Sequence, residues 1–177
     1  MWWKRLLNVN APYQWNIRRL HLGRTLEIGC GIGRNLESLG DDSIGIDHNE
    51  ASVTAARARG HRAYTTEEFL RDFAPSSTQF DSLLIAHVIE HVAAGTAREL
   101  VMTYLAYLKP RARVAFITPQ EAGYKSDASH VAFTDFDALE ELAKDLGLSV
   151  IRRYSFPFPR PVGKLFKYNE FVVVALR

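Results

Sequence analysis

Three glycines at alternate positions are the residues of this chain with the clearest chemical consequence. Gly29, Gly31 and Gly33 follow a short apolar run, with the carboxylate of Glu27 just ahead of them and a second acid, Asp47, ending the next apolar run. Glycine accepts a positive φ and lets a ligand approach the main chain without meeting a Cβ. A helix that begins behind such a turn directs its free N–H groups and its positive end at the ligand. The pattern predicts a turn that holds a nucleotide-like cofactor.

The spacing of these glycines separates two kinds of cofactor site. A dinucleotide fingerprint reads G-x-G-x-x-G, whereas the third glycine here comes one residue earlier. Residues 27–33 resemble instead the E/D-x-G-x-G-x-G signature of class I S-adenosylmethionine-dependent methyltransferases. Residues 80–92 are similar to the fourth-strand motif of the small-molecule branch, and residues 108–119 and 129–134 resemble later segments of that family. The similarity spans about residues 24–176. It implies an enzyme that uses S-adenosylmethionine and releases S-adenosylhomocysteine.

The resemblance also implies roles for the residues around the glycine turn. The loop passes under the methionine part of the cofactor, and Asp47 takes both ribose hydroxyls through charge-assisted hydrogen bonds. Glu27 either accepts from the amino group of the cofactor or orients the loop, and His48 either flanks the adenine or lies in solvent. Cys30 is interpreted as a small residue beside the cofactor rather than a nucleophile. The expected cofactor-binding residues are Glu27, Gly29, Cys30, Gly31, Gly33, Asp47, His48, Thr66, Ala86 and His87.

The segment after the third expected strand departs from the family pattern. Family members often carry an acid there that takes the adenine amino group, whereas this chain has Thr65, Thr66 and Glu67. The adenine contact is therefore left open between Thr66, through its backbone or hydroxyl, and Glu67.

Methyl transfer from a sulfonium depends on alignment and exclusion of water more than on a nucleophilic side chain. A general base is sometimes needed, and an imidazole suits that task near neutral pH. His130 is the candidate base, with the alternative that it ties its loop to the sheet. His87, just past the fourth strand, is expected to contact cofactor or substrate and is the second catalytic candidate. Tyr124 and Asp127, together with His130, are expected to contact the acceptor.

The segment after the expected fourth strand carries residue types that bind metals. The i, i+4 spacing of His87 and His91, with Glu90 between them, would suit two ligands on one face of a helix. No second cluster with clear ligand spacing completes such a site. The sequence therefore gives no expectation of a bound metal.

The composition narrows the class of protein. The chain has 177 residues, 22 Lys and Arg against 20 Asp and Glu, and a net charge of +2, which does not favour a nucleic-acid binder. The lone cysteine excludes an intrachain disulfide and is compatible with the cytoplasm, the location that we expect. The sequence has no run of 18 apolar residues, so no membrane span is predicted. Residues 1–7 mix aromatic and basic side chains and are interpreted as a packing segment, with contact to a membrane surface as the alternative.

Strands that alternate with helices indicate one domain over residues 1–177, built on a mostly parallel sheet with helices on both faces. The expected fold is α/β and Rossmann-like, doubly wound and seven-stranded, with an antiparallel edge strand. An N-terminal helical segment covers residues 1–23, a helix over 34–39 follows the glycine turn, and residues 119–134 form an irregular loop on the substrate side. The expected strands cover residues 25–28, 43–46, 62–65, 82–86, 113–118, 148–154 and 170–176. Ligands of such sheets bind beyond the carboxyl ends of the strands.

These observations favour a methyltransferase that acts on a small molecule or on a carbohydrate- or lipid-linked acceptor. The basic and aromatic residues of the last third, such as Phe158, Arg160 and Tyr168, keep an RNA methyltransferase open as an alternative. A module that binds the cofactor without catalysis is a further alternative. The oligomeric state is left open by the sequence.

Overall fold

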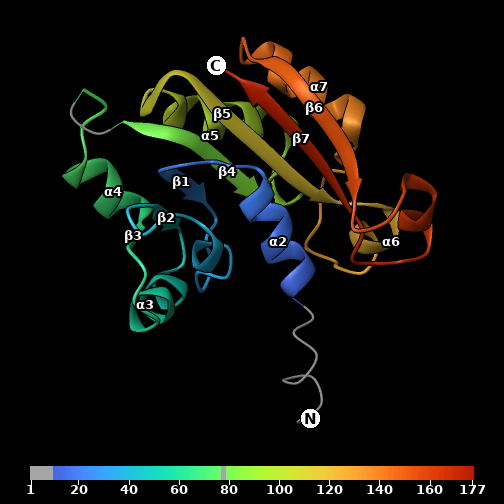
Figure 1. The fold of residues 1–177 in the computed structure, drawn as a ribbon, viewed down its shortest axis with the longest axis horizontal. Helices are drawn as coiled ribbons and strands as arrows, with labels where there is room; N and C mark the ends of the chain where they lie inside the picture. Colours follow the sequence, from blue (N-terminus) through green and yellow to red (C-terminus); the bar gives the residue numbers. More distant parts are fainter. Residues whose placement is uncertain (1–9, 77–78) are drawn as a thin grey trace.

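A single mixed sheet organises the chain, whose computed structural model describes residues 10–76 and 79–177. Its seven strands lie in the order β3-β2-β1-β4-β5-β7-β6 (Figure 1). The strands are β1 (Thr25–Ile28), β2 (Ile44–Asp47), β3 (Ala63–Thr65), β4 (Phe80–Ala86), β5 (Leu108–Pro119), β6 (Ser149–Phe156) and β7 (Glu170–Leu176). The first five pair in parallel, and β7 pairs antiparallel with both β5 and β6. The expected Rossmann-like class is confirmed, with the reversed strand inserted one place in from the edge.

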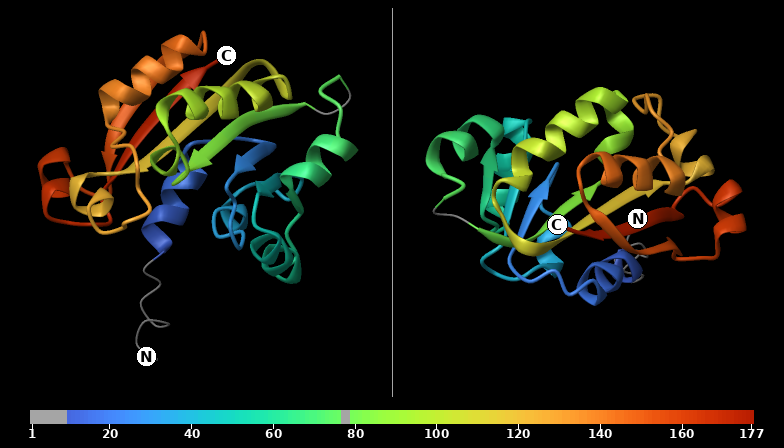
Figure 2. Two further views of the ribbon diagram at one scale, coloured as in Figure 1. Left: turned by 180° about the vertical axis from the view of Figure 1, so that it is seen from behind. Right: turned by 90° about the horizontal axis from the view of Figure 1, so that it is seen from above.

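Helices cover both faces of the sheet (Figure 2). On one face, α4 (Thr66–Asp72), α5 (Ala94–Leu105) and α7 (Phe136–Asp145) pack over a continuous apolar core. The other face is covered by α2 (Ala11–Arg19) and α3 (Glu50–Ala58). Successive side chains of a strand point to opposite faces, and the central strand β4 is accordingly apolar on both sides.

The prediction of a helix over residues 34–39 is wrong. Residues 31–35 form turns, and only the three-residue 3-10 helix η1 (Leu36–Ser38) follows them. Asn35 and Ser38 are weak helix formers, and a segment this short gains too few hydrogen bonds to offset nucleation of an α-helix. The N–H groups at this end of β1 therefore come from the glycine turn itself and not from a helix terminus.

Other boundaries differ by a few residues. Thr65, the last residue of β3, caps α4, because the Thr65 side chain accepts from the Glu68 amide while the Glu68 side chain accepts from the Thr65 amide. The irregular segment 119–134 contains one helical turn, α6 (Glu121–Tyr124). Within residues 10–76 and 79–177, no helix combines the length and apolar character that a membrane crossing requires. The interpretation of residues 1–7 lies outside the described residues.

Candidate functional site

The glycine turn leaves the backbone of Gly31 facing open space, whereas Gly29 and Gly33 are closed in by side chains. Gly29, Gly31 and Gly33 adopt φ of 70°, 52° and 81°. A Cβ at Gly29 would fall 2.3 Å from a methyl of Val88, whereas a Cβ at Gly31 would meet no atom within 4 Å. The first glycine is thus required by packing, and the second presents bare main chain to whatever binds. Cys30 is buried, and burial raises the pKa of its thiol to about 12, which argues against a nucleophilic role.

Asp47, the last residue of β2, hydrogen-bonds both the glycine turn and the segment that leads into α3. Its Oδ2 accepts from the Gly31 amide at 2.8 Å and its Oδ1 accepts from the Asn49 amide at 2.9 Å. The side chain is only 9% exposed, while that of the neighbouring His48 is 93% exposed. Each carboxylate oxygen carries two lone pairs. Asp47 therefore keeps acceptor capacity for a ligand while it holds the turn.

Glu27 lies inside the protein, directly before the turn. Its Oε1 accepts from Asn35 Nδ2 at 2.7 Å, whereas its Oε2 is buried and has no hydrogen-bond partner among the described residues. Burial raises the pKa of the carboxyl to about 8, although the Asn35 hydrogen bond opposes this effect. Buried polar atoms are normally hydrogen-bonded, so the unpaired Oε2 indicates a place where a ligand could bind.

A cleft of about 610 Å³ opens beyond the carboxyl ends of β1, β2 and β4. It brings together five of the predicted residues: Gly29, Asp47, His48, Thr66 and His87. Its remaining lining is mainly apolar, with Ile28, Ile46, Val88, His91, Val92, Leu100, Tyr104 and Ser129. Ala86, at the end of β4, is buried and does not line this cleft. Apolar walls with a few polar groups suit the binding of a nucleoside.

A second cleft, of about 340 Å³, lies on the side of α2. Its lining residues come from segments spread along the whole described chain: Asn10, Tyr13, Gln14, Arg34, Asn35, Glu37, Arg59, His87, Pro119, Lys167, Tyr168, Asn169 and Glu170. The Tyr13 hydroxyl donates to the Tyr168 carbonyl at 2.7 Å and links α2 to the segment before β7. Sequence reasoning missed Tyr13, Asn35 and Glu170, because no local pattern signals a contact between such distant segments.

His87 belongs to both clefts. It has a φ of 57°, uncommon for a residue with a Cβ, and its ring is held by two carboxylates. Nε2 lies 2.9 Å from Glu170 Oε1 and Nδ1 lies 3.2 Å from Glu90 Oε1. Burial lowers the pKa of His87, but the bonds to Glu170 and Glu90 outweigh it and raise the pKa to about 10. At neutral pH the ring is an imidazolium that donates from both nitrogens.

The expected acceptor residues lie on the segment 119–134 beside the larger cleft, which reaches that segment at Ser129. His130 Nδ1 lies 2.8 Å from the Tyr124 carbonyl, and the two rings stack with centroids 5.4 Å apart. The Asp127 carboxylate accepts from the Ser129 amide and hydroxyl, which lowers its pKa. Tyr124, Asp127 and His130 are not among the residues that line either cleft.

The fold and the site define the class of the protein, a class I methyltransferase with its ligand cleft at the carboxyl ends of the parallel strands. Residues 3–153 match the sequence model of the methyltransferase domain family. The chain belongs to that family and is a methyltransferase. No curated protein sequence matches it.

Solved structures share the whole fold at low sequence identity. A SAM-dependent methyltransferase from Archaeoglobus fulgidus is 18% identical with a TM-score of 0.71, over 98% of this chain and 97% of its own. The N-methyltransferase NodS from Bradyrhizobium japonicum, in complex with S-adenosylhomocysteine, is 17% identical with a TM-score of 0.66, over 93% and 85%. Magnesium protoporphyrin IX methyltransferase from Synechocystis, with bound SAM, is 14% identical with a TM-score of 0.65, over 96% and 81%.

Proposed function

We propose that this methyltransferase, a single domain over residues 1–177, transfers the methyl group of S-adenosylmethionine to a small-molecule or carrier-linked acceptor. The observation that carries the proposal is the bare backbone of Gly31, hydrogen-bonded at its amide to the buried Asp47 carboxylate. A ligand at this place contacts bare main chain where another residue would have a Cβ. It also contacts an acid with free lone pairs. That combination fits a ribose diol next to a flexible thioether or sulfonium chain.

The residues around the turn fit the rest of the donor. The apolar lining of the larger cleft, with Val88 and Leu100, suits the adenine, and Thr66 and His48 line the same cleft. The unsatisfied Oε2 of Glu27 suits the ammonium group of the methionine half. When bound, the donor supplies an activated methyl group and a neutral leaving group. The protein aligns the acceptor with that methyl group and keeps water out.

We assign the acceptor to the smaller cleft, where it would contact His87. The donor fills the larger cleft, and His87 is the residue that both clefts share. A ring held between Glu90 and Glu170 keeps its proton, so His87 acts as a fixed donor and not as a general base. Tyr124, Asp127 and His130 lie beside the larger cleft, which reaches their segment at Ser129, so they are not assigned to this acceptor site. Structures of similar fold include enzymes for magnesium protoporphyrin IX and for plantazolicin, which favours compounds of that scale over nucleic acid.

A cytoplasmic location belongs to the same proposal. It is supported by Cys30, the single cysteine of the chain, whose thiol is buried and free. Cell fractionation followed by detection of the protein tests it.

The test is calorimetry with S-adenosylmethionine and S-adenosylhomocysteine. We expect both to bind, and Asp47→Asn to weaken each by at least about tenfold, since a hydrogen bond to a charged group contributes roughly 1.5–3 kcal/mol. Asp41→Asn is the control, because this exposed acid lies away from both clefts and should leave the affinity unchanged. Absence of binding at millimolar donor would refute the proposal.

The acceptor class is tested separately, with a cell extract and donor carrying a labelled methyl group. A labelled low-molecular-weight or lipid-extractable product is expected. Label that becomes soluble only after ribonuclease treatment would contradict the proposed acceptor and favour the RNA alternative.

A further inference from the structure

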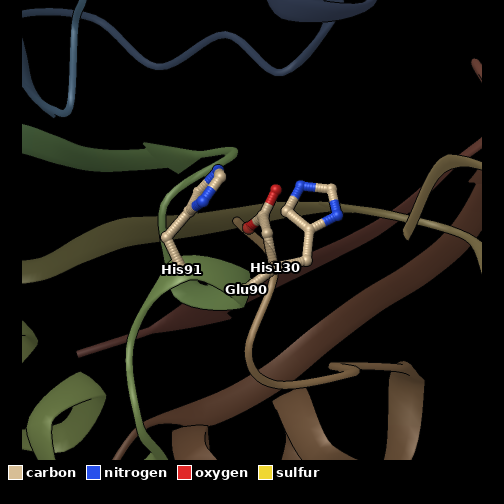
Figure 3. Close-up of side chains that lie close together, drawn as sticks. All are labelled: Glu90, His91 and His130. Atoms are coloured by element: carbon tan, nitrogen blue, oxygen red, sulfur yellow. The ribbon is translucent and has the colours of Figure 1, made fainter. Parts of the chain in front are cut away.

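Two histidines and a buried glutamate converge next to the larger cleft. Glu90 and His91 belong to the 3-10 helix η2 (Ile89–His91), and His130 comes from the segment 119–134. One potential ligand atom from each of the three lies within 4.8 Å of the others. Figure 3 shows the Glu90 carboxylate between the two imidazole rings, with a ring nitrogen of His130 turned toward it.

We propose that Glu90, His91 and His130 bind a divalent transition-metal cation such as Zn²⁺. Two imidazoles and one carboxylate are a donor set typical of Zn²⁺ sites that keep an open position. The remaining positions are left for water or for an acceptor oxygen. The proposal goes beyond methyl transfer and does not depend on it.

Glu90 has an oxygen to spare for a cation. The side chain is fully buried, and its Oε1 is engaged by His87 at 3.2 Å. Its Oε2 is buried without a hydrogen-bond partner among the described residues. A buried carboxylate oxygen left unpaired is costly. A cation bound between the rings would satisfy it.

Both histidines are oriented as metal ligands are. His130 Nδ1 lies 2.8 Å from the Tyr124 carbonyl, which can only accept, so Nδ1 carries the hydrogen and Nε2 keeps the lone pair of the neutral ring. His91 Nδ1 lies 3.1 Å from Ser129 Oγ, whose own hydrogen goes to Asp127. The Ser129 hydroxyl thus accepts from His91 Nδ1, and Nε2 of His91 keeps a free lone pair. Ligating histidines are usually fixed by such an N–H bond to a carbonyl or a relayed carboxylate.

The backbone holds the third ligand in place. The carbonyl of Glu90 accepts from the amides of Val131 and Ala132, at 2.8 and 3.1 Å. The two residues that follow His130 are therefore bonded to the backbone of Glu90, which keeps His130 next to the residue with which it shares the site. Metal–ligand bonds of about 2.0–2.2 Å place tetrahedral ligand atoms roughly 3.3 Å apart. Small side-chain rotations close the gap from 4.8 Å.

The experiment uses the full chain, stripped with a chelator and titrated with Zn²⁺ against a competing chelator. Co²⁺ absorption in the visible serves as a second probe of nitrogen and oxygen coordination. We expect one equivalent to bind with micromolar or tighter affinity. His130→Ala and His91→Ala should each lose at least about 100-fold, because loss of an orienting partner alone costs 10–100-fold. Ser129→Ala, which removes only the bond that orients His91, should lose about tenfold.

His21→Asn is the matched control, because His21 belongs to neither the cluster nor the clefts and asparagine tolerates its positive φ. It should bind Zn²⁺ as the unaltered chain does. Circular dichroism confirms that each variant folds. If one histidine variant fails to fold, the other histidine variant is compared with the unaltered chain by the rise in Tm that Zn²⁺ induces in each. The proposal is overturned if the unaltered chain binds no stoichiometric metal, or if both histidine variants bind as tightly as the control.

Discussion

Binding of the methyl donor is predicted to release a proton from Glu27. In the free protein the carboxyl has a pKa of about 8, raised by burial, so it is about 90% protonated at pH 7. Its Oε2 has no partner among the described residues. An ammonium group placed there stabilises the ionised form and returns the pKa toward the ordinary value. Donor binding at pH 7 should therefore release about 0.9 proton.

The same linkage makes the donor affinity depend on pH. If the carboxyl is ionised in the complex, lowering the pH from 7 to 6 should weaken binding about ninefold, since the free protein must lose a proton that is bound more completely at the lower pH. Calorimetry in buffers of different ionisation enthalpy measures the proton count directly. Glu27→Gln keeps the shape and removes the titration, so its proton release should be near zero.

A ligand without the ammonium group completes the test. 5′-Methylthioadenosine carries the adenosine and thioether of the donor but lacks its amino-acid half, and it should bind without proton release. S-Adenosylhomocysteine retains that half and should behave as the donor does. Equal proton release for all three ligands, or full release in Glu27→Gln, would refute the assignment of Glu27 to the ammonium group.

Three further predictions concern packing and the bare turn. Gly29→Ala should destabilise the fold by at least about 2 kcal/mol in urea unfolding, because it combines a positive φ with a clash against Val88; unchanged stability would contradict the packing described. Gly31→Ala should cost only about 1–2 kcal/mol but weaken donor binding by more than about tenfold, whereas Gly95→Ala, in α5, should stabilise by about 0.5–1 kcal/mol and leave calorimetric affinity unchanged. Phe116→Ala, at a fully buried position of β5, should cost about 3–5 kcal/mol by thermal or urea unfolding, and a cost below about 1 kcal/mol would show that this core is not packed as described.

The predictable part of this fold rests on local chemistry. Alternate glycines and a strand-end acid report backbone freedom and charge within a few residues, so the turn and Asp47 were found from sequence. The apolar stretch of β4 likewise indicates a strand covered on both faces. Residues 34–39 were mispredicted as a helix, because their spacing resembles one while their length and composition do not support it.

The unpredictable part depends on distant segments meeting. His87 contacts Glu170 only because β7 is inserted beside β5 in reverse, a pairing that no local pattern specifies. The spacing of His87 and His91 suggested ligands on one helix, but His87 follows β4 and His91 ends a single 3-10 turn. The third member of the cluster, His130, is delivered by a loop bonded to the Glu90 carbonyl. The sequence gives no expectation of a metal, because no second cluster with clear ligand spacing accompanies His87 and His91.

Because the imidazole of His87 borders both clefts, a donor and an acceptor placed as proposed share one wall. Glu90 and Glu170 already hold that ring in one orientation through both of its nitrogens. Neither ligand therefore has to order the ring on binding, and the entropic cost of doing so is met within the protein itself.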